Sequence, residues 1–341
     1  MVLLAASVLF LTGCGREPLY QSQSYVFGTL VDISIYGEPE QRARAHAAHI
    51  QQVFQRLHDQ LHAWKAGSEL GRLNAAIARG EEAAVSPELG GILADASRYS
   101  VASRGLFNPA IGHLIRAWGF QRDDFVPVRP DPQKIRALLH ANPQMTDLYI
   151  KGGRAGSRNP AVRLDLGGYA KGWALDLAAE YLRRERVPGA LVNIGGNIIA
   201  VGRHGDRPWR VGIQHPRQPG PLATLDLPDG WAIGTSGDYQ RYFEMNGLRF
   251  CHILDPRNGT PVQGVQAVTV LIPPGPQAGT LSDVSTKPVF ILGLSGWRAA
   301  AQAMGVQHVL LIDGRGQTHV SQALQHRLTF TDPDVRPEIL P

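Results

Sequence analysis

The stretch Asp165-Leu-Gly-Gly-Tyr-Ala-Lys-Gly-Trp-Ala-Leu-Asp176 decides how this chain is organised. Residues 161–164 before it can be extended, and the apolar spacing after it predicts a helix over 176–186. Gly167 and Gly168 carry no Cβ, so the backbone there can approach a ligand closely. The following helix would point its free N–H groups at the space above the glycines, where an anion is favoured. The residues leave two interpretations open: a phosphate cradle, or a tight strand-to-helix turn.

Length and charge limit the kinds of protein this can be. The 341 residues can bury a large core, and they allow one large domain or two. A formal net charge of +5 is mildly basic and compatible with an anionic small molecule or a membrane surface. Lys and Arg are scattered and form no basic tract, which argues against nucleic-acid binding.

The N-terminus resembles that of a bacterial lipoprotein. The apolar run 2–11 is too short to span a bilayer and is typical of a signal-peptide core, although a buried strand is the alternative. Leu11-Thr-Gly-Cys14 resembles a lipobox, so we expect a signal peptide over 1–13 and lipidation of Cys14. A tether over 14–24 and one domain over 25–335 would follow, lipid-anchored to a membrane of the bacterial envelope and facing the periplasm. No Lys or Arg precedes the apolar run, so the true start can lie upstream.

The second cysteine has a structural prediction of its own. A lipidated Cys14 would leave Cys251 without a partner for an intrachain disulfide. Cys251 lies in an apolar strand pattern and is expected to pack. No Cys or His spacing resembles a zinc site.

Periodicity predicts an α+β fold. Alternation indicates a strand over 25–36, and a helical pattern follows from Pro39 to His62. His46, His49, His58 and His62 on that helix favour a solvated face over a metal pair. Asn246-Gly247 is a strong hairpin signal. Helices are also predicted at 87–103, near 118 and at 280–292, and strands at 190–201 (interrupted by Gly195-Gly196), 209–213, 222–227, 231–239, 242–245, 249–254, 265–272, 307–312 and 318–320. Strands outnumber helices, so we expect largely antiparallel or mixed sheets with flanking helices in a single compact unit.

Several short motifs follow one another along the chain. They are Asp165-Leu-Gly-Gly-Tyr-Ala-Lys-Gly172, Asn193-Ile-Gly-Gly-Asn197, Thr235-Ser-Gly-Asp-Tyr239, His252-Ile-Leu-Asp-Pro-Arg-Asn-Gly259 and Asp283-Val-Ser-Thr286, with Phe27-Gly-Thr29, Ser68-Glu-Leu70, Leu73-Asn74 and Gly105-Leu-Phe-Asn-Pro109 in the N-terminal half. In this order they resemble the motifs of the FAD:protein FMN transferases, the ApbE-type bacterial lipoproteins. The resemblance runs from about residue 27 to residue 293.

The resemblance implies a magnesium-dependent transfer of FMN from FAD to a threonine of a partner protein, with release of AMP. Acceptors would be flavin-carrying subunits of membrane redox complexes. His252 would be the general base. The FAD site would include Phe27, Trp64, Leu106, Phe107, Asn108, Asp165, Lys171 and Ile253, and the metal would face Gly168, Thr280, Asp283 and Lys287. An FAD pyrophosphatase releasing FMN and AMP and a non-catalytic flavin-binding lipoprotein are the alternatives.

These residue types suit such chemistry. Cations and backbone N–H groups stabilise charge on phosphoryl oxygens. Magnesium prefers carboxylate and carbonyl oxygens, as at Asp283. A histidine with an ordinary pKa near 6.5 suits proton removal from a hydroxyl. Aromatic side chains can form the walls of a flavin pocket.

Several assignments have structural alternatives. Asp283 could cap the helix that follows it, Trp64 and Phe107 could be core residues, and Asp238 could be an ordinary turn residue. Two positions depart from the family pattern: Lys287 stands where a threonine is common, and Asn108 stands where an aspartate is common. Either Thr286 fails to reach the metal, which then has fewer protein ligands, or the Lys287 ammonium takes over part of the metal's charge-neutralising work.

Overall fold

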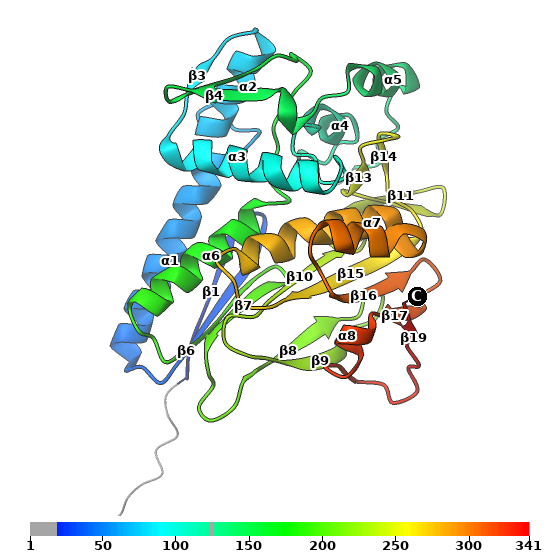
Figure 1. Ribbon diagram of the computed structural model, residues 1–341. Coiled ribbons are helices and arrows are strands. Elements are labelled where there is room, and N and C mark those ends of the chain that lie inside the picture. The colour runs from blue at the N-terminus through cyan, green and yellow to red at the C-terminus, as the bar shows by residue number, and fades with distance from the viewer. Residues whose placement is uncertain (1–18, 123, 125, 341) are drawn as a thin grey trace, which may run out of the picture.

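A mostly antiparallel sheet runs through the molecule (Figure 1). The computed structural model describes residues 19–122, 124 and 126–340. Within these residues the sheet has nine strands in the order β1-β2-β6-β7-β10-β15-β16-β17-β19, with β17 and β19 parallel. They are β1 (Leu19–Val26), β2 (Thr29–Tyr36), β6 (Gly189–Ile194), β7 (Asn197–Gly202), β10 (Ala232–Gly237), β15 (Val265–Ile272), β16 (His308–Asp313), β17 (Thr318–Val320) and β19 (Glu338–Ile339).

The middle strands are buried on both faces, which explains their continuous apolar sequences. In β7, Ile199 packs beneath the helices, while Ile198 packs on the opposite side against β8 (Trp209–Gln214) and β9 (Pro221–Leu227). Every residue of β15 is buried. The helices therefore cover one face of the sheet, and the β8–β9 layer with β18 (Thr329–Phe330) and α8 (Gln322–Gln325) lies towards the other (Figure 1).

Three helices form the layer above the sheet: α1 (Glu40–Leu61), α6 (Ala170–Arg184) and α7 (Ala278–Ala303). Helices α6 and α7 touch through their backbones, since a Cβ on Gly172 would lie 2.5 Å from the carbonyl oxygen of Gly279. Pro288 lies inside α7, and Gly293 interrupts its helical geometry with φ 55°. The helix predicted over 280–292 therefore ends at a real break.

A second group of elements lies above this layer in Figure 1. Two of its helices, α2 (Glu69–Ala78) and α3 (Pro87–Ala102), are capped by Ser68 and Ser86, whose hydroxyls accept hydrogen bonds from the backbone N–H groups of Gly71 and Leu89. No helix among the described residues is both long and apolar enough to cross a membrane. The group comprises α2 (Glu69–Ala78), β3 (Ala83–Ala84), α3 (Pro87–Ala102), α4 (Gly112–Ala117), α5 (Pro132–Ala141), η1 (Met145–Asp147), β4 (Leu148–Lys151) and β5 (Arg154–Ser157).

The predicted α+β class is confirmed, and so is the hairpin at Asn246-Gly247, which joins β11 (Tyr242–Met245) to β12 (Leu248–Cys251). A further short pair, β13 (Leu254–Asp255) and β14 (Thr260–Pro261), follows. Cys251 is buried, as expected, and burial raises the pKa of its thiol to about 12.

Four local predictions were wrong. Residues 19–24 of the expected tether belong to β1, and the strand expected over 25–36 is a hairpin that turns at Phe27-Gly28. The run 190–201 is also a hairpin, because Gly195 and Gly196 adopt positive φ and reverse the chain. Helix α6 begins at residue 170, six residues before the expected start, whereas the run 161–164, expected to be extended, forms an isolated β-bridge at Arg163. The expected signal peptide and Cys14 lie outside the described residues.

Candidate functional site

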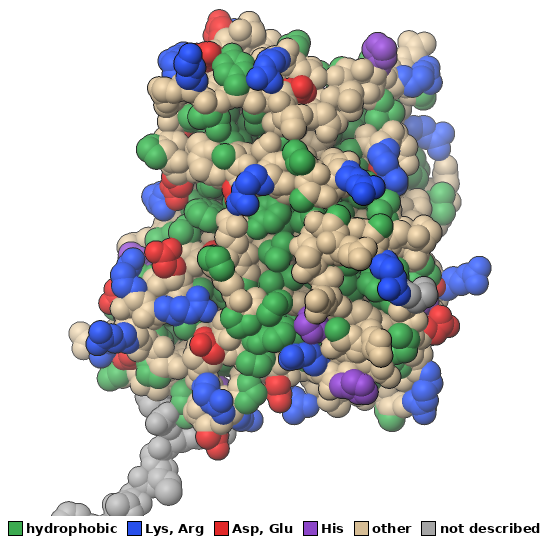
Figure 2. Space-filling view, viewed as in Figure 1, with side chains coloured by type: hydrophobic (Ala, Val, Ile, Leu, Met, Phe, Trp, Pro, Cys, Tyr) green, Lys and Arg blue, Asp and Glu red, His purple; other side chains and the backbone are tan. Residues whose placement is uncertain are grey.

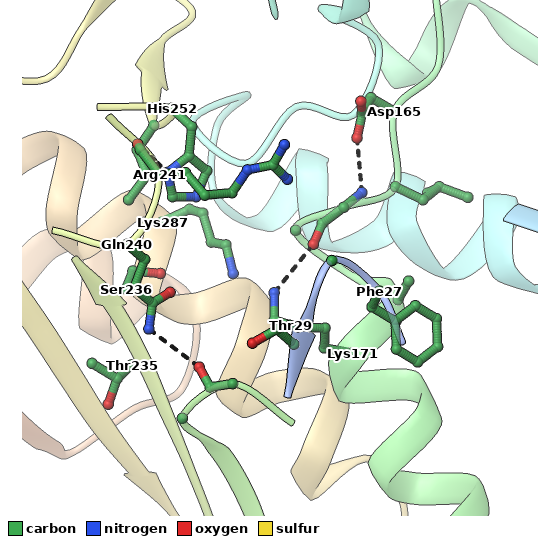
Figure 3. A pocket seen from close by; sticks show the side chains of 18 of the residues that line it. Phe27, Thr29, Asp165, Lys171, Thr235, Ser236, Gln240, Arg241, His252 and Lys287 are labelled. Atoms are coloured by element: carbon green, nitrogen blue, oxygen red, sulfur yellow. Dashed lines mark hydrogen bonds between the residues drawn. The ribbon is translucent and has the colours of Figure 1, made fainter. Parts of the chain in front are cut away.

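A cavity of about 780 Å³ lies where the two groups of helices meet the edge of the sheet, a size suited to a large cofactor. Its walls come from the β1–β2 turn, the segment after α1, the 165–171 turn, the β6–β7 turn, the end of β10, the segment 252–254 and α7. Figure 3 shows side chains from these separate elements converging on one space. The folded sheet and helices thus assemble residues that lie far apart in the sequence.

Aromatic groups form one end of the cavity. Phe27 has φ 58° in its turn, and its ring packs against Phe54 and His58 with centroids 6.1 and 5.9 Å away. His58 and His62 line the same end, and their rings lie 5.3 Å apart. The expected solvated histidine face is therefore wrong for this part of α1, because these rings pack around the cavity.

Trp64 and Asp165 are joined across the cavity wall. The indole Nε1 of Trp64 donates a hydrogen bond to Asp165 Oδ2 at 2.9 Å, and the Arg163 guanidinium lies 4.4 Å from the centre of the indole ring. Asp165 Oδ1 accepts from the N–H of Gly167 at 2.8 Å, which fixes the glycine turn. Asp165 therefore holds the shape of the turn as well as facing the cavity.

The start of α6 meets a carboxylate of this chain. The N–H of Gly172 donates to Asp283 Oδ2 at 3.0 Å, so Asp283 caps α6 from α7. This excludes the alternative that Asp283 caps its own helix, because it lies inside α7. In turn, Asp176 of α6 accepts from the N–H groups of Gly279 and Thr280 at 2.7 and 2.8 Å. The two helices therefore cap each other.

The second oxygen of Asp283 is paired with lysine. Lys287 Nζ donates to Asp283 Oδ1 and to the Asp283 carbonyl oxygen, the latter at 2.6 Å, and Lys171 Nζ lies 3.8 Å from Oδ1. Burial would raise the pKa of Asp283, but the two ammonium groups hold it below its usual value. Burial lowers the pKa of Lys287 to about 8, so the ammonium is still the main form at neutral pH. The pair is an ion pair at pH 7.

His252 lies directly after β12, and its backbone N–H continues the ladder to the carbonyl of Arg241 at 3.0 Å. Its Nδ1–H donates to the same carbonyl at 3.2 Å, which leaves Nε2 as the nitrogen able to accept a proton. Burial, with the positive charges of Arg241 and Lys171, lowers the pKa of His252 to about 3. The ordinary pKa near 6.5 that we expected is therefore wrong for the free protein.

Most of the predicted site residues line the cavity, and two lie behind its wall. Thr280 and Asp283 are 0% and 1% exposed, and the Thr280 hydroxyl donates to Asp176 Oδ2 at 2.6 Å. The residues on the wall are Phe27, Trp64, Leu106, Phe107, Asn108, Asp165, Gly168, Lys171, His252, Ile253 and Lys287.

The structure places Phe107 and Asp238, for which the sequence left a structural alternative, and Asn108, which departs from the family pattern. Phe107 is 4% exposed, so it belongs to the core and to the cavity wall at once. Asn108 holds its own loop, since its amide donates to the Pro143 carbonyl and accepts from the Ala110 N–H. Asp238 forms a two-point ion pair with Arg217, at 2.7 and 2.6 Å.

Sequence reasoning missed Arg241 and Asp176. Figure 3 shows Arg241 reaching into the cavity near His252, and its Nη2 donates to the carbonyl groups of Phe120 and Arg122. A basic residue two positions after the Thr235–Tyr239 motif was the available signal for Arg241. Asp176 closes the central motif of the sequence, yet its partner Thr280 is 104 positions away. The distribution of surface charge does not point to a site either, because Lys and Arg are scattered over the face shown in Figure 2.

The residues expected to hold magnesium do not fit that ion as they are arranged. Of the Asp283 carboxylate oxygens, Oδ1 is paired with Lys287 and Oδ2 accepts from the N–H of Gly172, while the Thr280 hydroxyl is bonded to Asp176. A Cβ on Gly168 would lie 3.2 Å from Lys287 Cε, so the lysine chain covers that backbone. The described residues contain no group of three His, Cys, Asp or Glu side chains that could hold a metal. Lysine nitrogen occupies the place where a cation would bind.

Comparison with known proteins supports the resemblance. The ApbE family model matches residues 27–310. The chain is 40% identical to an FAD:protein FMN transferase of Rhodobacter capsulatus over 327 residues, which cover 96% of this chain and 61% of that protein. It is 32% identical to an FAD:protein FMN transferase of Vibrio cholerae over 78% of this chain and 80% of that protein. The chain thus spans about three fifths of the Rhodobacter relative.

Solved structures agree with the fold. The ApbE protein of Thermotoga maritima superposes with a TM-score of 0.81 at 27% identity, over 91% of this chain and 99% of that one. The flavinyl transferase ApbE of Pseudomonas stutzeri gives 0.79 at 27% identity, over 93% and 98%. With the ordered motifs, the cavity and these matches in place, the chain belongs to the ApbE family.

Proposed function

We propose that this protein is an FAD:protein FMN transferase that attaches FMN to a threonine of an acceptor protein. The observation that carries the proposal is a single cavity lined by His252, Lys171 and Lys287 and, at its aromatic end, by Phe27. A flavin fits the aromatic end, and a diphosphate fits the lysines. The named activity of the relatives supports the same reaction.

The chemical step is a displacement at phosphorus. The threonine oxygen bonds to the phosphorus of the FMN half, the bond from that phosphorus to the bridging oxygen breaks, and AMP leaves with the bridging oxygen. His252 Nε2 takes the hydroxyl proton and later releases it to solvent. Its low pKa keeps Nε2 unprotonated, and the negative charge of bound FAD would raise its basicity.

The positive charge in this step comes from the chain. Lys171 and Lys287 face the cavity and can neutralise charge on the phosphoryl oxygens. The resemblance implies magnesium, which would supply the same neutralisation. Because the expected ligands do not fit it as arranged, no step here depends on a metal.

The test is transfer to a candidate acceptor and to the same acceptor with its threonine replaced by alanine. Intact-mass spectrometry should find FMN on the threonine protein and none on the alanine protein. Equal labelling of both would contradict a threonine ester. Free FMN with AMP would indicate the pyrophosphatase, and unchanged FAD would indicate a flavin-binding protein without catalysis.

We also propose that the acceptor is a flavin-carrying subunit of a membrane redox complex. The supporting feature is Leu11-Thr-Gly-Cys14, which would anchor the enzyme by a lipid at the periplasmic side of a membrane. A lipid anchor would hold the enzyme on the same surface as its acceptor.

A further inference from the structure

The side chain of Lys287 stands out because it is partly buried, paired with a buried carboxylate and aimed into the cavity. It comes from the third turn of α7, and Figure 3 shows it extending among the labelled side chains of the cavity. The Lys287 side chain is 16% exposed, and Asp283 beneath it is 1% exposed. Its ammonium contacts two oxygens of Asp283, the backbone carbonyl and Oδ1.

The charge balance at this point leaves little need for another cation. One carboxylate faces two ammonium groups, with Lys171 Nζ 3.8 Å from Asp283 Oδ1. A divalent ion on Asp283 would have to displace Lys287 and would then lie close to two positive charges. Two ammonium groups beside one carboxylate leave a net positive charge, which favours binding of a diphosphate.

Thr286 cannot take the role of a metal ligand beside Asp283. It is 1% exposed, and its hydroxyl lies 2.7 Å from Ser236 Oγ on β10 and donates to the Asp283 carbonyl at 2.7 Å. The hydroxyl therefore faces the sheet. Thr286 therefore does not reach the site, which both interpretations left open by the sequence allow, and the pairing of Lys287 with Asp283 favours the one in which lysine replaces the metal's charge.

A purely structural role explains Lys287 poorly. Burying an ion pair costs desolvation, and an apolar pair of similar volume is often as stable. An ion pair retained on the wall of a cavity keeps its positive end available to a ligand, which an apolar pair would not do.

We propose that the Lys287 ammonium is the built-in cation of this centre and that FMN transfer here proceeds without a divalent metal. This rests on the proposed function. As the bond from the FMN phosphorus to the bridging oxygen breaks, the negative charge that passes to the AMP phosphate is neutralised by Lys287 and Lys171. The threonine proton goes to His252, so atoms and charge balance without a further reactant.

The first experiment uses the full chain, FAD and the acceptor, with all metals removed by EDTA. The proposal predicts a transfer rate within about twofold of the rate with Mg²⁺. A rate that appears only when Mg²⁺ is added would overturn it. No transfer under either condition would instead contradict the proposed function, so the two failures are distinguishable.

The second experiment uses Lys287→Thr, with Lys287→Arg as the charge-preserving variant and the exposed Lys151→Thr as the control. In EDTA, Lys287→Thr should lose about 10²–10³-fold in rate, the range for removing one stabilising group, and Mg²⁺ should restore part of it. Lys287→Arg should lose much less, and Lys151→Thr should match the parent. Equal rates for Lys287→Thr and the parent in EDTA would overturn the proposal.

Metal binding gives a readout independent of activity. Electron paramagnetic resonance of Mn²⁺ without FAD should show free ion with the parent and bound ion with Lys287→Thr, because the threonine variant exposes Asp283. Stoichiometric Mn²⁺ binding by the parent would contradict the proposal. If melting shows that Lys287→Thr is unfolded, the parent's Mn²⁺ titration and its rate in EDTA decide the matter.

Discussion

Asp176 and Asp283 each cap the helix on which the other lies. Asp176 on α6 accepts from the first turn of α7, and Asp283 on α7 accepts from the first turn of α6. The helices can meet this closely because Gly172 and Gly279 face each other. This reciprocal arrangement fixes α6 against α7, so the position of Lys171 on α6 relative to Lys287 and Asp283 on α7 depends on the two caps.

The cap at Asp176 gives a stability prediction with a definite sign. Burial raises the pKa of Asp176 to about 6, so the folded chain binds this proton more tightly than the unfolded chain, and the carboxyl's contribution to stability falls as pH rises from about 4 to about 7. Asp176→Asn removes that dependence. Relative to the variant, the parent should therefore gain up to about 3 kcal/mol on going from pH 7 to pH 4.

Urea unfolding of both proteins at several pH values measures this difference. Asp226→Asn, on the exposed side of β9, is the control and should track the parent. A difference between parent and Asp176→Asn that stays constant from pH 4 to pH 7 would show that the Asp176 pKa is not raised.

Lys171 is expected to contribute to FAD binding by charge. Lys171→Met should weaken FAD binding, and the loss should shrink as salt is raised, because screening weakens the attraction between an ammonium and a diphosphate. Fluorescence titration at low and high salt measures it. The exposed Lys134→Met is the control and should bind as the parent does. Equal affinity of Lys171→Met and the parent at low salt would remove Lys171 from the site.

His252 is expected to act on the attacking hydroxyl. His252→Gln should bind FAD nearly as well as the parent and lose about 10²–10⁴-fold in transfer rate, the usual range for general acid–base catalysis. The exposed His326→Gln is the control. Loss of FAD affinity in proportion to the rate would make His252 a binding residue instead.

The low pKa of His252 adds a spectroscopic prediction. Its ring signal in nuclear magnetic resonance should show no titration between pH 8 and pH 5 in the free protein, because protonation lies near pH 3. Bound FAD should raise the pKa by placing a diphosphate near the ring. A titration midpoint near 6.5 without FAD would contradict the buried, positively surrounded position described here.

Membrane attachment has its own test. Cys14→Ser should release the protein from the membrane fraction or leave its precursor unprocessed. Cys251→Ser is the matched control, because that thiol is buried and cannot carry a lipid while the chain is folded. Normal processing and retention of Cys14→Ser in the membrane fraction would end the lipoprotein hypothesis.

The sequence predicted elements where local signals are strong. Asn246-Gly247 specifies a hairpin because both residues tolerate positive φ, and helix α3 begins at Pro87 as predicted, with Ser86 as its cap. Phe27 gave no such signal, since an aromatic residue with positive φ is held by its packing on Phe54. Local rules therefore turned two hairpins into single strands.

The site was predictable as a set of residue types and not as an arrangement. The motifs identified His252 and Lys171 as members, but not the environment that lowers the pKa of His252. That environment includes Arg241, whose carbonyl lies beside the imidazole only because the β11–β12 hairpin brings residues 241 and 252 together. The approach of Lys171 to Asp283 likewise depends on α6 and α7 crossing at two glycines, whereas Lys287 pairs with Asp283 within α7.

The most direct test of the central claim is the ratio of products in one incubation of the enzyme with FAD and an acceptor. Protein-bound FMN by intact mass and AMP by chromatography are measured at the same time points. Transfer predicts one AMP for each FMN on the acceptor, with no free FMN above the level without enzyme. AMP that accumulates with free FMN while the acceptor stays unmodified would contradict the account.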